Sequence, residues 1–437
     1  MSEPKLARTT GGLPPRHHPP RDFDADPMGA LDEGLRRYGP AFRIDLDGVD
    51  TVLLGTWAGL GDLFAAERGR LQVLNTPLVH DLFGRALFNL TGDAHTEARH
   101  RLRPALSGRS LPGYATSLLE VTGPVTAGWA RHGAEDLYAA AREVTLAMSA
   151  RVLLGLAPGD PDAAVFAADF ERFVAATGAP AGRRRFTTRQ YWAGLGARRR
   201  LHALFARCMA AAQARPCPGS ALSAMAVGFQ DAPKTVGPLT DHLLALLIAA
   251  RETTASLITW SLIELAQHRE RALAAVGEAR AAAADPRSLT ARDGVPVLRA
   301  VLAETQRLHS PNLLSVRQAT CPVRLAGYRL PAGTRVAYST SAGHFDPDAF
   351  PQPHAFRPDR FPGGQAAGAR LWAFGGGAHA CLGRPLAELM ALTVLASTLD
   401  QGLPRLPDGP PTRIRYRPAK APLDPVPFVL DPLEPAL

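Results

Sequence analysis

The sequence predicts a mainly α-helical protein with a small β region. Apolar residues recur at helical spacing over most of the 437 residues, and short linkers separate these stretches. Strand patterns are confined to two places, 41–56 and 323–344. We find no internal repeat in the sequence. We therefore expect a helical protein that carries two short β segments.

Composition limits the classes of partner. Hydrophobic residues make up 46% of the chain, enough for a substantial core, and the formal net charge is +9. Almost all of the excess rests on arginine, since the only lysines are Lys5, Lys234 and Lys420. A basic surface is compatible with nucleic acid, anionic lipid or an acidic protein. Nucleic acid is the least favoured of the three, because the sequence shows no helix-turn-helix signature and no basic motif interleaved with aromatic residues.

Cysteine usage and hydropathy indicate the compartment. Cys208, Cys217, Cys321 and Cys381 show no disulfide-like clustering, which fits a reducing cytoplasm. Residues 1–22 are polar and rich in proline, histidine and arginine, so we expect a flexible N-terminal arm rather than a signal peptide. No uncharged apolar run reaches the roughly 18 residues that a membrane span needs. We expect a cytoplasmic protein without a membrane anchor.

The first elements are a hairpin and a basic helix. Residues 41–56 alternate around Asp47-Gly48, which is typical of a β-hairpin. Residues 93–103 open a helix on which His95 and Arg99, four positions apart, share a face. That face is either solvated or a site where two cationic donors bind an anionic group.

The region 165–215 contains two arginine runs, 183–185 and 198–200. They flank Phe186, Tyr191 and Trp192. One interpretation is a solvated arginine face. The other is a docking surface for an acidic partner, for anionic lipid or for an acidic carrier domain that holds the substrate.

Residues 240–268 form the most apolar long helix, and a helix that is apolar all round is buried. Arg251, Glu252 and Thr253 lie within it. A carboxylate in such surroundings is costly unless it is paired or protonated, so its presence indicates a function. The structural alternatives are an Arg251–Glu252 pair and a Thr253 hydroxyl bonded to the carbonyl four residues earlier.

The C-terminal third combines a helix, strands and an irregular stretch. Glu304 and Arg307 are neighbours on a helix and are expected to pair. Residues 323–330 and 334–340 predict two strands joined by a turn at Pro331-Ala332-Gly333. Residues 345–370 are rich in proline and glycine, and we expect them to be irregular.

A glycine-rich loop at 374–383 places Cys381 just ahead of a helix that starts near Pro385. The positive end of a helix and its free N–H groups lower the pKa of a thiol and bind the thiolate. The loop therefore suits an anionic sulfur ligand beside a bulky cofactor. An inert buried cysteine is the alternative. A zinc site with His379 is weaker, because no second pair stands at metal-ligand spacing.

This loop resembles the haem-binding loop of the cytochrome P-450 family. The matching positions are Phe374, Gly375, Gly377, His379, Cys381 and Gly383. Other family motifs follow in the expected order between about residues 40 and 430: His95-x-x-x-Arg99, the acid–threonine pair in the apolar helix, and Glu304-x-x-Arg307. Ala250 replaces the second glycine of the acid–threonine motif. The resemblance implies the cytochrome P-450 fold in a single haem domain, 23–437.

The resemblance also assigns roles. Cys381 is the axial ligand of haem b iron, beside Phe374, Gly375 and His379 of the same loop. The expected propionate donors are His95, Arg99 and Arg317. Glu252 and Thr253 assist proton delivery. The expected buried ion network consists of Glu304, Arg307 and Arg360. The candidate pocket residues, with parts of 74–90, are Leu246, Ala249, Ala250, Leu313 and Leu314.

The activity implied is a monooxygenase that uses dioxygen. No flavin or iron–sulfur segment is present, so electrons from NAD(P)H are expected to arrive through a separate acidic ferredoxin and its reductase. The apolar pocket favours a terpenoid or polyketide of bacterial secondary metabolism, either free or bound to a carrier. We expect the enzyme to be a monomer. Two alternatives stay open. One is a haem-thiolate enzyme that couples, cyclises or rearranges its substrate. The other is a non-catalytic haem sensor, which the presence of Glu252 and Thr253 disfavours.

Overall fold

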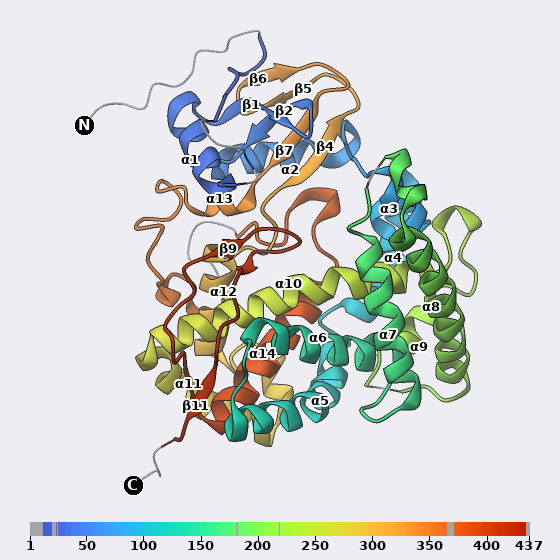
Figure 1. Cartoon of the computed structure of the whole chain (residues 1–437), viewed down its shortest axis with the longest axis vertical. Helices are drawn as coiled ribbons and strands as arrows, with labels where there is room; N and C mark the ends of the chain where they lie inside the picture. Colours follow the sequence, from blue (N-terminus) through green and yellow to red (C-terminus); the bar gives the residue numbers. More distant parts are fainter. Residues whose placement is uncertain are drawn as a thin grey trace. The chain divides into compact units, whose positions relative to one another are not determined.

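The computed structural model describes residues 12–19, 23, 25–180, 182–217, 219–364 and 371–433 (Figure 1). The chain forms two compact units. Of the described residues, the first unit contains those within 12–74, 306–356 and 371–381, and the second those within 75–305, 357–364 and 382–433. The predicted mainly helical class with a small β region is confirmed. Whether the haem domain is single, 23–437, stays a prediction.

The first unit is built on a five-stranded sheet with the order β1-β2-β7-β4-β3. Its elements are α1 (Pro27–Tyr38), β1 (Ala41–Leu46), β2 (Val49–Leu54), α2 (Trp57–Arg70), β3 (Leu71–Val73), β4 (Ser315–Ala319), β5 (Val323–Leu325), β6 (Tyr328–Leu330), β7 (Arg335–Tyr338) and α13 (Thr340–His344). The pair β2–β7 is parallel and the other pairs are antiparallel.

The β1–β2 hairpin confirms the strand pattern at 41–56, with Asp47 and Gly48 both at positive φ in its turn. The prediction of one strand over 323–330 is wrong. Ala326 and Gly327 also take positive φ, so this stretch folds back on itself as the β5–β6 hairpin, and β7 joins the large sheet separately. A two-residue turn of this kind is inconspicuous in sequence when its first residue is alanine.

Part of the expected N-terminal arm is bound to the sheet. Residues 1–11 and 20–22 lie outside the described residues. Between them, Arg43 N donates to Pro15 O and His17 N donates to Arg43 O, both at 2.7 Å. The His17 side chain is buried against Phe42. The expectation of a loose arm is therefore wrong for this stretch, because it adds backbone hydrogen bonds to the edge of β1.

One face of the sheet packs against α2, and this contact builds the core of the first unit. Leu60, Leu63 and Phe64 of α2 are buried in it. The Phe64 ring lies 5.3 Å from that of Tyr338 and 4.9 Å from that of Trp372. Because Trp372 stands shortly before the cysteine loop, this core also fixes where the loop starts.

The second unit is helical. Its longer helices are α3 (Pro77–Phe83), α4 (Gly92–Leu106), α5 (Leu111–His132), α6 (Leu137–Leu154), α7 (Pro161–Ala176), α8 (Arg189–Ala214), α9 (Leu222–Gly228), α10 (Leu239–Gln267), α11 (Arg269–Ala284), α12 (Pro296–Leu308, whose last three residues belong to the first unit) and α14 (Arg384–Gln401). Short strands pair as β8 (Leu403–Arg405) with β11 (Val429–Asp431) and β9 (Ile414–Arg415) with β10 (Ala421–Pro422).

Helix α10 runs through the middle of this unit, and α6 and α14 pack along it (Figure 1). The segment Lys234–Gln267 is long and apolar enough to cross a membrane, with a mean hydropathy of 1.3 over its best window. Of that window, 67% is buried inside the protein, as in the core helix of a globular unit. Helices α7 and α8 form an antiparallel hairpin, joined through the 3-10 turn η2 (Arg183–Thr187).

Candidate active site

The cysteine loop is held by its own backbone. Gly375 N donates to Trp372 O at 2.7 Å, and Cys381 N donates to Phe374 O at 2.8 Å. Gly375 and Gly377 take φ values of 68° and 63°, which favour glycine over any residue with a Cβ. Cys381 is exposed, so the loop presents it instead of burying it in a core. The expectation of an inert buried cysteine does not describe this arrangement.

Helix α2 is the support on which the loop lies. A Cβ at Gly376 would stand 2.6 Å from Phe64, and one at Gly377 would stand 2.5 Å from Glu67 Oε2. Glu67 Oε2 also accepts the backbone N–H of His379 at 3.1 Å. The two glycines therefore allow a close approach that any side chain would prevent.

Glu67 was not predicted from the sequence, although a signal exists. It continues the buried series Leu60, Leu63 and Phe64 at helical spacing, so its carboxylate falls on the apolar face of α2. An acid on such a face needs a partner. Its second partner is Arg317, whose Nε and Nη2 lie 2.8 and 2.7 Å from Glu67 Oε1.

Arg317, the expected propionate donor, is buried in β4. Besides Glu67, it donates to the hydroxyl of Tyr338 at 3.2 Å. Burial, the largest cause, raises the pKa of Tyr338. Any anion that Arg317 bound would compete with the Glu67 carboxylate. Its role toward a cofactor stays a prediction.

His344 ties the start of the loop to the first unit and was also missed. It is fully buried, accepts the Trp372 backbone N–H on Nε2 at 2.9 Å, and contacts Ser310 Oγ through Nδ1 at 3.2 Å. Burial, together with the nearby Arg307 charge, lowers its pKa to about 3. A neutral imidazole with one acceptor nitrogen is what this hydrogen bond requires. It ends the five-residue helix α13, which is too short to give a periodic signal.

The predicted ion network is buried and has backbone partners as well. Glu304, fully buried, accepts Arg357 N at 2.8 Å and Arg360 Nε at 3.3 Å. The Arg307 guanidinium donates to the carbonyl oxygens of His344, Pro353 and Ala355 at 3.0, 2.6 and 3.1 Å. The structure thus brings Glu304 and Arg360 together, and Arg307 also holds the stretch around 344–355.

Helix α4 carries the other expected donors. His95 is buried and Arg99 half-buried, one turn apart on the same face. Neighbouring Arg101 is directed elsewhere, to Glu97 at 2.7 Å and to Asp231. The basic stretch of α4 is therefore not one uniformly solvated face.

The centre of α10 is the part of that helix that is not deeply buried. Residues 241–245 and 254–265 are buried, whereas Ala249 is exposed and Leu246, Ala250 and Thr253 are half-buried. These positions follow the i, i+3, i+4, i+7 spacing of a single helix face. The Thr253 hydroxyl donates to Ala249 O at 2.6 Å, as in the structural alternative. An apolar, accessible face with one hydroxyl is the result.

Glu252 lies beside that face and is surrounded by donors. It accepts hydrogen bonds from Tyr138 Oη at 2.5 Å and Arg251 Nη1 at 2.7 Å, and Arg142 Nε lies 3.2 Å away. Burial, the largest cause, and the hydrogen bond to Glu252 both raise the pKa of Tyr138. Arg251 also pairs with Glu171 of α7. The Arg251–Glu252 pair named as a structural alternative is therefore present, and α6 adds Tyr138 and Arg142, which spacing within α10 could not reveal.

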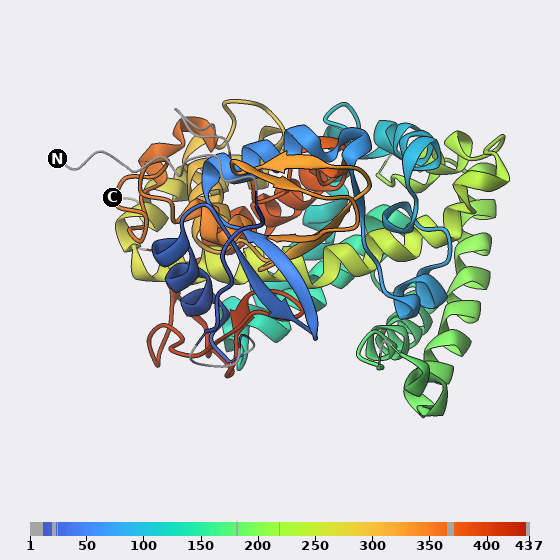
Figure 2. The same cartoon turned by 90° about the horizontal axis from the view of Figure 1, so that it is seen from above.

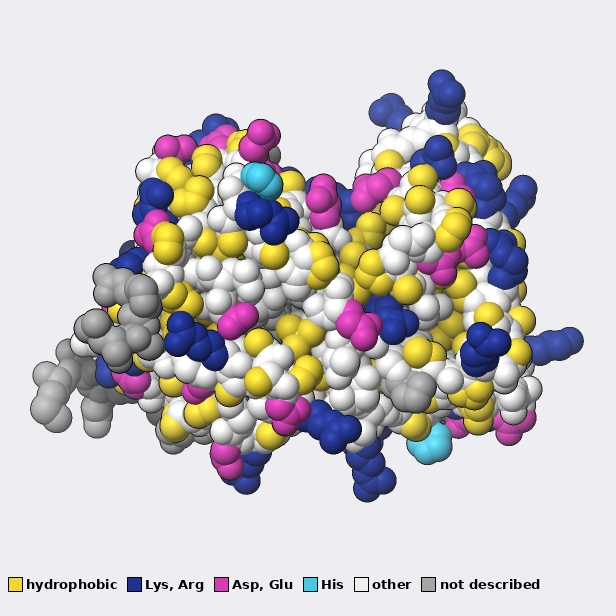
Figure 3. Space-filling model, turned by 90° about the horizontal axis from the view of Figure 1, so that it is seen from below, with side chains coloured by type: hydrophobic (Ala, Val, Ile, Leu, Met, Phe, Trp, Pro, Cys, Tyr) yellow, Lys and Arg dark blue, Asp and Glu magenta, His cyan; other side chains and the backbone are white. Residues whose placement is uncertain are grey.

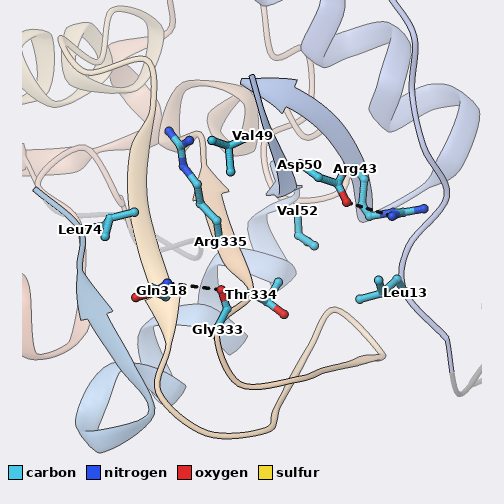
Figure 4. A pocket seen from close by; sticks show the side chains of 10 residues that line it. All are labelled: Leu13, Arg43, Val49, Asp50, Val52, Leu74, Gln318, Gly333, Thr334 and Arg335. Atoms are coloured by element: carbon cyan, nitrogen blue, oxygen red, sulfur yellow. Dashed lines mark hydrogen bonds and ion pairs between the residues drawn. The ribbon is translucent and has the colours of Figure 1, made fainter. Parts of the chain in front are cut away.

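Two hollows of about 300 Å³ each were found at the surface. One lies over β2, β4 and β7 and is lined by Leu13, Arg43, Val49, Asp50, Val52, Leu74, Gln318, Gly333, Thr334 and Arg335 (Figure 4). Of these, Leu74 alone falls in a predicted pocket segment, at the start of the 74–90 stretch. The other is lined by His80, Gly84, Arg85, Asn89, Leu90, Thr91 and Ala94, and most of it lies within the 74–90 stretch expected to border the substrate. Leu313 is buried and Leu314 half-buried in the first unit.

The residues present fit a haem. A thiol is exposed in a loop that cannot carry side chains at Gly376 and Gly377, and α14 begins at Arg384, three residues beyond Cys381. Thiolate ligation from such a loop is one of the known ways to bind haem iron. Cys381 would hold the iron. The roles of His95 and Arg99 toward the acidic groups of a porphyrin stay predictions.

Comparison with known proteins gives one family. The cytochrome P450 family model matches residues 234–413. The sterol 14alpha-demethylase of Mycobacterium tuberculosis is 27% identical over 415 residues, 91% of each chain. A putative cytochrome P450 138 of the same species is 26% identical over 388 residues, 84% of this chain and 82% of the relative.

Solved structures agree on the fold. The retinoic acid-bound cyanobacterial CYP120A1 superposes with a TM-score of 0.79 at 23% identity, over 97% of this chain and all of that one. A second cytochrome P450, CYP102L1, gives 0.77 at 18% identity, over 95% of this chain. The cysteine loop, the order of the motifs and these matches together show that the chain belongs to the cytochrome P450 family, as a haem-thiolate monooxygenase.

Proposed function

We propose that the protein oxidises a hydrophobic small molecule of terpenoid or polyketide type in bacterial secondary metabolism. The observation that carries this proposal is the accessible centre of α10, where Leu246, Ala249 and Ala250 present only apolar groups around the Thr253 hydroxyl. An apolar wall with few polar groups selects hydrophobic ligands. The names of two similar proteins mention a sterol and retinoic acid, which are both hydrophobic.

The chain's own residues would hold and orient haem b. Cys381 supplies the thiolate, and its loop, with Phe374, Gly375 and His379, is fixed by hydrogen bonds to Trp372 and Glu67. His95, Arg99 and Arg317 are the proposed propionate donors. The bound haem supplies dioxygen activation, which an electron-donating thiolate ligand favours.

Thr253 and Glu252 are the proposed proton-delivery residues. Because the Thr253 hydroxyl proton is donated to Ala249 O, the lone pairs of Oγ1 are left to accept a hydrogen bond on the accessible face of α10. Glu252 is held by Tyr138, Arg142 and Arg251. To exchange a proton with this face, Glu252 has to release at least one of these donors. Tyr138 and Arg142 are therefore positioning residues for Glu252.

Electrons would come from NAD(P)H through an acidic ferredoxin and its reductase, with the enzyme acting as a monomer in the cytoplasm. The positive net charge of +9, which comes from residues 172–230, supports steering of an acidic partner toward the protein, since opposite charges speed association. Binding of the ferredoxin should then weaken steeply as salt is raised. An affinity that does not change with salt concentration argues against an acidic partner.

The test of the substrate class is an optical titration of the purified ferric protein with terpenoids, polyketides and fatty acids. A low-to-high-spin shift with one class identifies that class. Ala249→Phe should weaken the shift by filling the apolar face, whereas Ala281→Phe, the same change on the exposed surface of α11, should leave it unchanged. A haem spectrum that no ligand shifts contradicts a free hydrophobic substrate and favours a carrier-bound one. Turnover with isotopically labelled dioxygen then separates oxygen insertion from coupling or rearrangement.

A further inference from the structure

Positive charge is concentrated in one segment of the second unit. Residues 172–230 contain ten arginines and no aspartate or glutamate. The other 378 residues therefore carry 39 basic and 40 acidic side chains, so this segment alone accounts for the positive net charge. It comprises the end of α7, the η2 turn, α8 and α9.

Half of these arginines stabilise the fold. Arg185 pairs with Asp81 of α3 at 2.7 Å, Arg198 with Asp241 of α10 at 2.7 Å, and Arg200 with Asp169 of α7 at 2.8 Å. Arg172 and Arg207 pair with Asp169 and Asp162. The two arginine runs thus use three members to fasten α8 and η2 to their neighbours, which corrects the interpretation of a wholly solvated face.

Three arginines at the turn of the hairpin have no such partner. Arg183, Arg184 and Arg189 are exposed, and none forms an ion pair among the residues that the structure describes. The turn lies at the projecting end of the α7–α8 hairpin, the green element at the lower right of Figure 2. Figure 3 shows basic side chains extending from the same end, next to hydrophobic ones.

Two aromatic rings are exposed among these charges. Phe186 is 46% and Trp192 56% exposed. Their ring centroids lie 6.5 Å apart, and the paired Arg185 lies 4.2 Å from the centre of the Phe186 ring. We call Arg183, Arg184, Phe186, Arg189 and Trp192 the hairpin tip.

Several polar groups of the turn have internal partners among the described residues, in contrast to the guanidinium groups of Arg183, Arg184 and Arg189. Trp192 Nε1 donates to Phe186 O at 2.9 Å, Thr187 Oγ1 to Arg184 O at 2.8 Å, and Thr188 Oγ1 to Arg185 O at 2.8 Å. Gly182 O accepts from Arg185 N and Nη1 at 3.1 Å. These internally bonded groups can leave water and keep their hydrogen bonds, as an apolar environment requires.

We infer that the hairpin tip binds the surface of an anionic phospholipid membrane. The arginines lie in the plane of the charged headgroups, and Phe186 and Trp192 enter the headgroup–acyl boundary. Aromatic rings beside cationic side chains favour this boundary. The contact is peripheral and reversible, because three cations and two rings are far from the apolar length of a span.

The experiment uses the full-length holoprotein and large unilamellar vesicles, either of phosphatidylcholine alone or with one third phosphatidylglycerol. Sedimentation should show binding only to the anionic vesicles, and it should fall as salt is raised. Replacing Arg183→Gln and Arg184→Gln together should weaken partitioning by about twenty-five-fold, roughly fivefold for each arginine. Tryptophan emission should shift to the blue on binding, and Trp192→Ser should lose that shift while it keeps its haem.

The matched control removes two exposed arginines elsewhere. Arg324 and Arg329 face each other across β5 and β6 and have no ion pair among the described residues. Arg324→Gln with Arg329→Gln changes the net charge by the same amount and should leave vesicle binding unchanged. Equal losses in both double variants overturn the assignment to the hairpin tip, as does binding to neutral vesicles alone. Failure to bind anionic vesicles at low salt, with binding of poly-glutamate through the same arginines, overturns the lipid surface in favour of an acidic protein.

Discussion

The carboxylate of Glu67 accepts the backbone N–H of His379, two residues before Cys381, at 3.1 Å. The same carboxylate pairs with Arg317, and its side chain is fully buried. One side chain of α2 therefore joins the cysteine loop to β4. Gly377 makes the contact possible, because a Cβ there would stand 2.5 Å from Glu67 Oε2.

Replacing Glu67→Gln should destabilise the protein and loosen its haem. The amide can still accept from His379, but Arg317 is left as a buried charge without its anion. Breaking a buried pair in this way costs about 3–5 kcal/mol. Urea unfolding and the rate of haem transfer to apomyoglobin measure the two effects.

The control for this change is Asp62→Asn on the same helix. Asp62 is exposed and accepts one hydrogen bond, from Ala326 N at 3.2 Å. Its loss should alter stability by less than about 1 kcal/mol. If Asp62→Asn and Glu67→Gln behave alike, the buried pair is not what holds the loop.

His344 should make stability fall in mild acid. Its pKa is about 3 in the folded protein against an ordinary value of 6.5, mainly because of burial. Below pH 6.5 the unfolded chain takes up a proton that the folded chain refuses, so the free energy of unfolding falls as the pH drops toward 3. The slope is about 1.4 kcal/mol per pH unit. Above pH 6.5 both states are neutral and the contribution vanishes.

The variant His344→Gln removes this titration and keeps an acceptor for Trp372 N. Its unfolding midpoint in urea, followed between pH 4 and 7, should vary less than that of the unchanged protein. His202 and His242 also have lowered pKa values because of burial, but they are present in both proteins and cancel in the comparison. Parallel curves for the two proteins would count against a neutral, buried His344.

Sequence reasoning succeeded where a pattern is local. The hairpin at 41–56, the long buried helix and the cysteine loop each have a spacing or a turn signal of their own, and the structure has all three. The pairing of Glu304 with Arg360 was expected only through the family resemblance, and the two lie 3.3 Å apart.

The sequence could not supply contacts between distant segments. Glu252 is held by Tyr138, 114 positions away, and Arg317 is held by Glu67, 250 positions away. Contacts between residues so far apart in the sequence produce no periodic pattern in it. The β5–β6 turn was missed for a different reason: Ala326 adopts a positive φ that alanine rarely takes.

Cys381→Ser should abolish the thiolate signature of the reduced carbonyl complex. The loop presents this cysteine in an exposed position, and a serine hydroxyl does not replace the thiolate as an electron donor. The absorbance of the reduced protein under carbon monoxide measures the change. Cys321→Ser, at a half-buried cysteine of the same unit, is the control and should keep the signature. An unchanged spectrum in Cys381→Ser would rule this residue out as ligand.

Thr253→Ala should preserve haem binding and reduction but divert electrons to peroxide. The substitution removes the only hydroxyl on the accessible face formed by residues 246, 249, 250 and 253, and with it an oxygen that can accept a hydrogen bond there. The ratio of product to NADPH consumed should fall while peroxide rises. Thr259→Ala is the matched control, because it removes a hydroxyl from the same helix. The Thr259 hydroxyl also donates to the carbonyl four residues earlier, Ala255 O, at 2.8 Å, but it is fully buried. This control should stay coupled, because its hydroxyl does not reach the accessible face. If Thr253→Ala still couples NADPH consumption fully to product, the hydroxyl has only a structural role in the helix, and other groups deliver the protons.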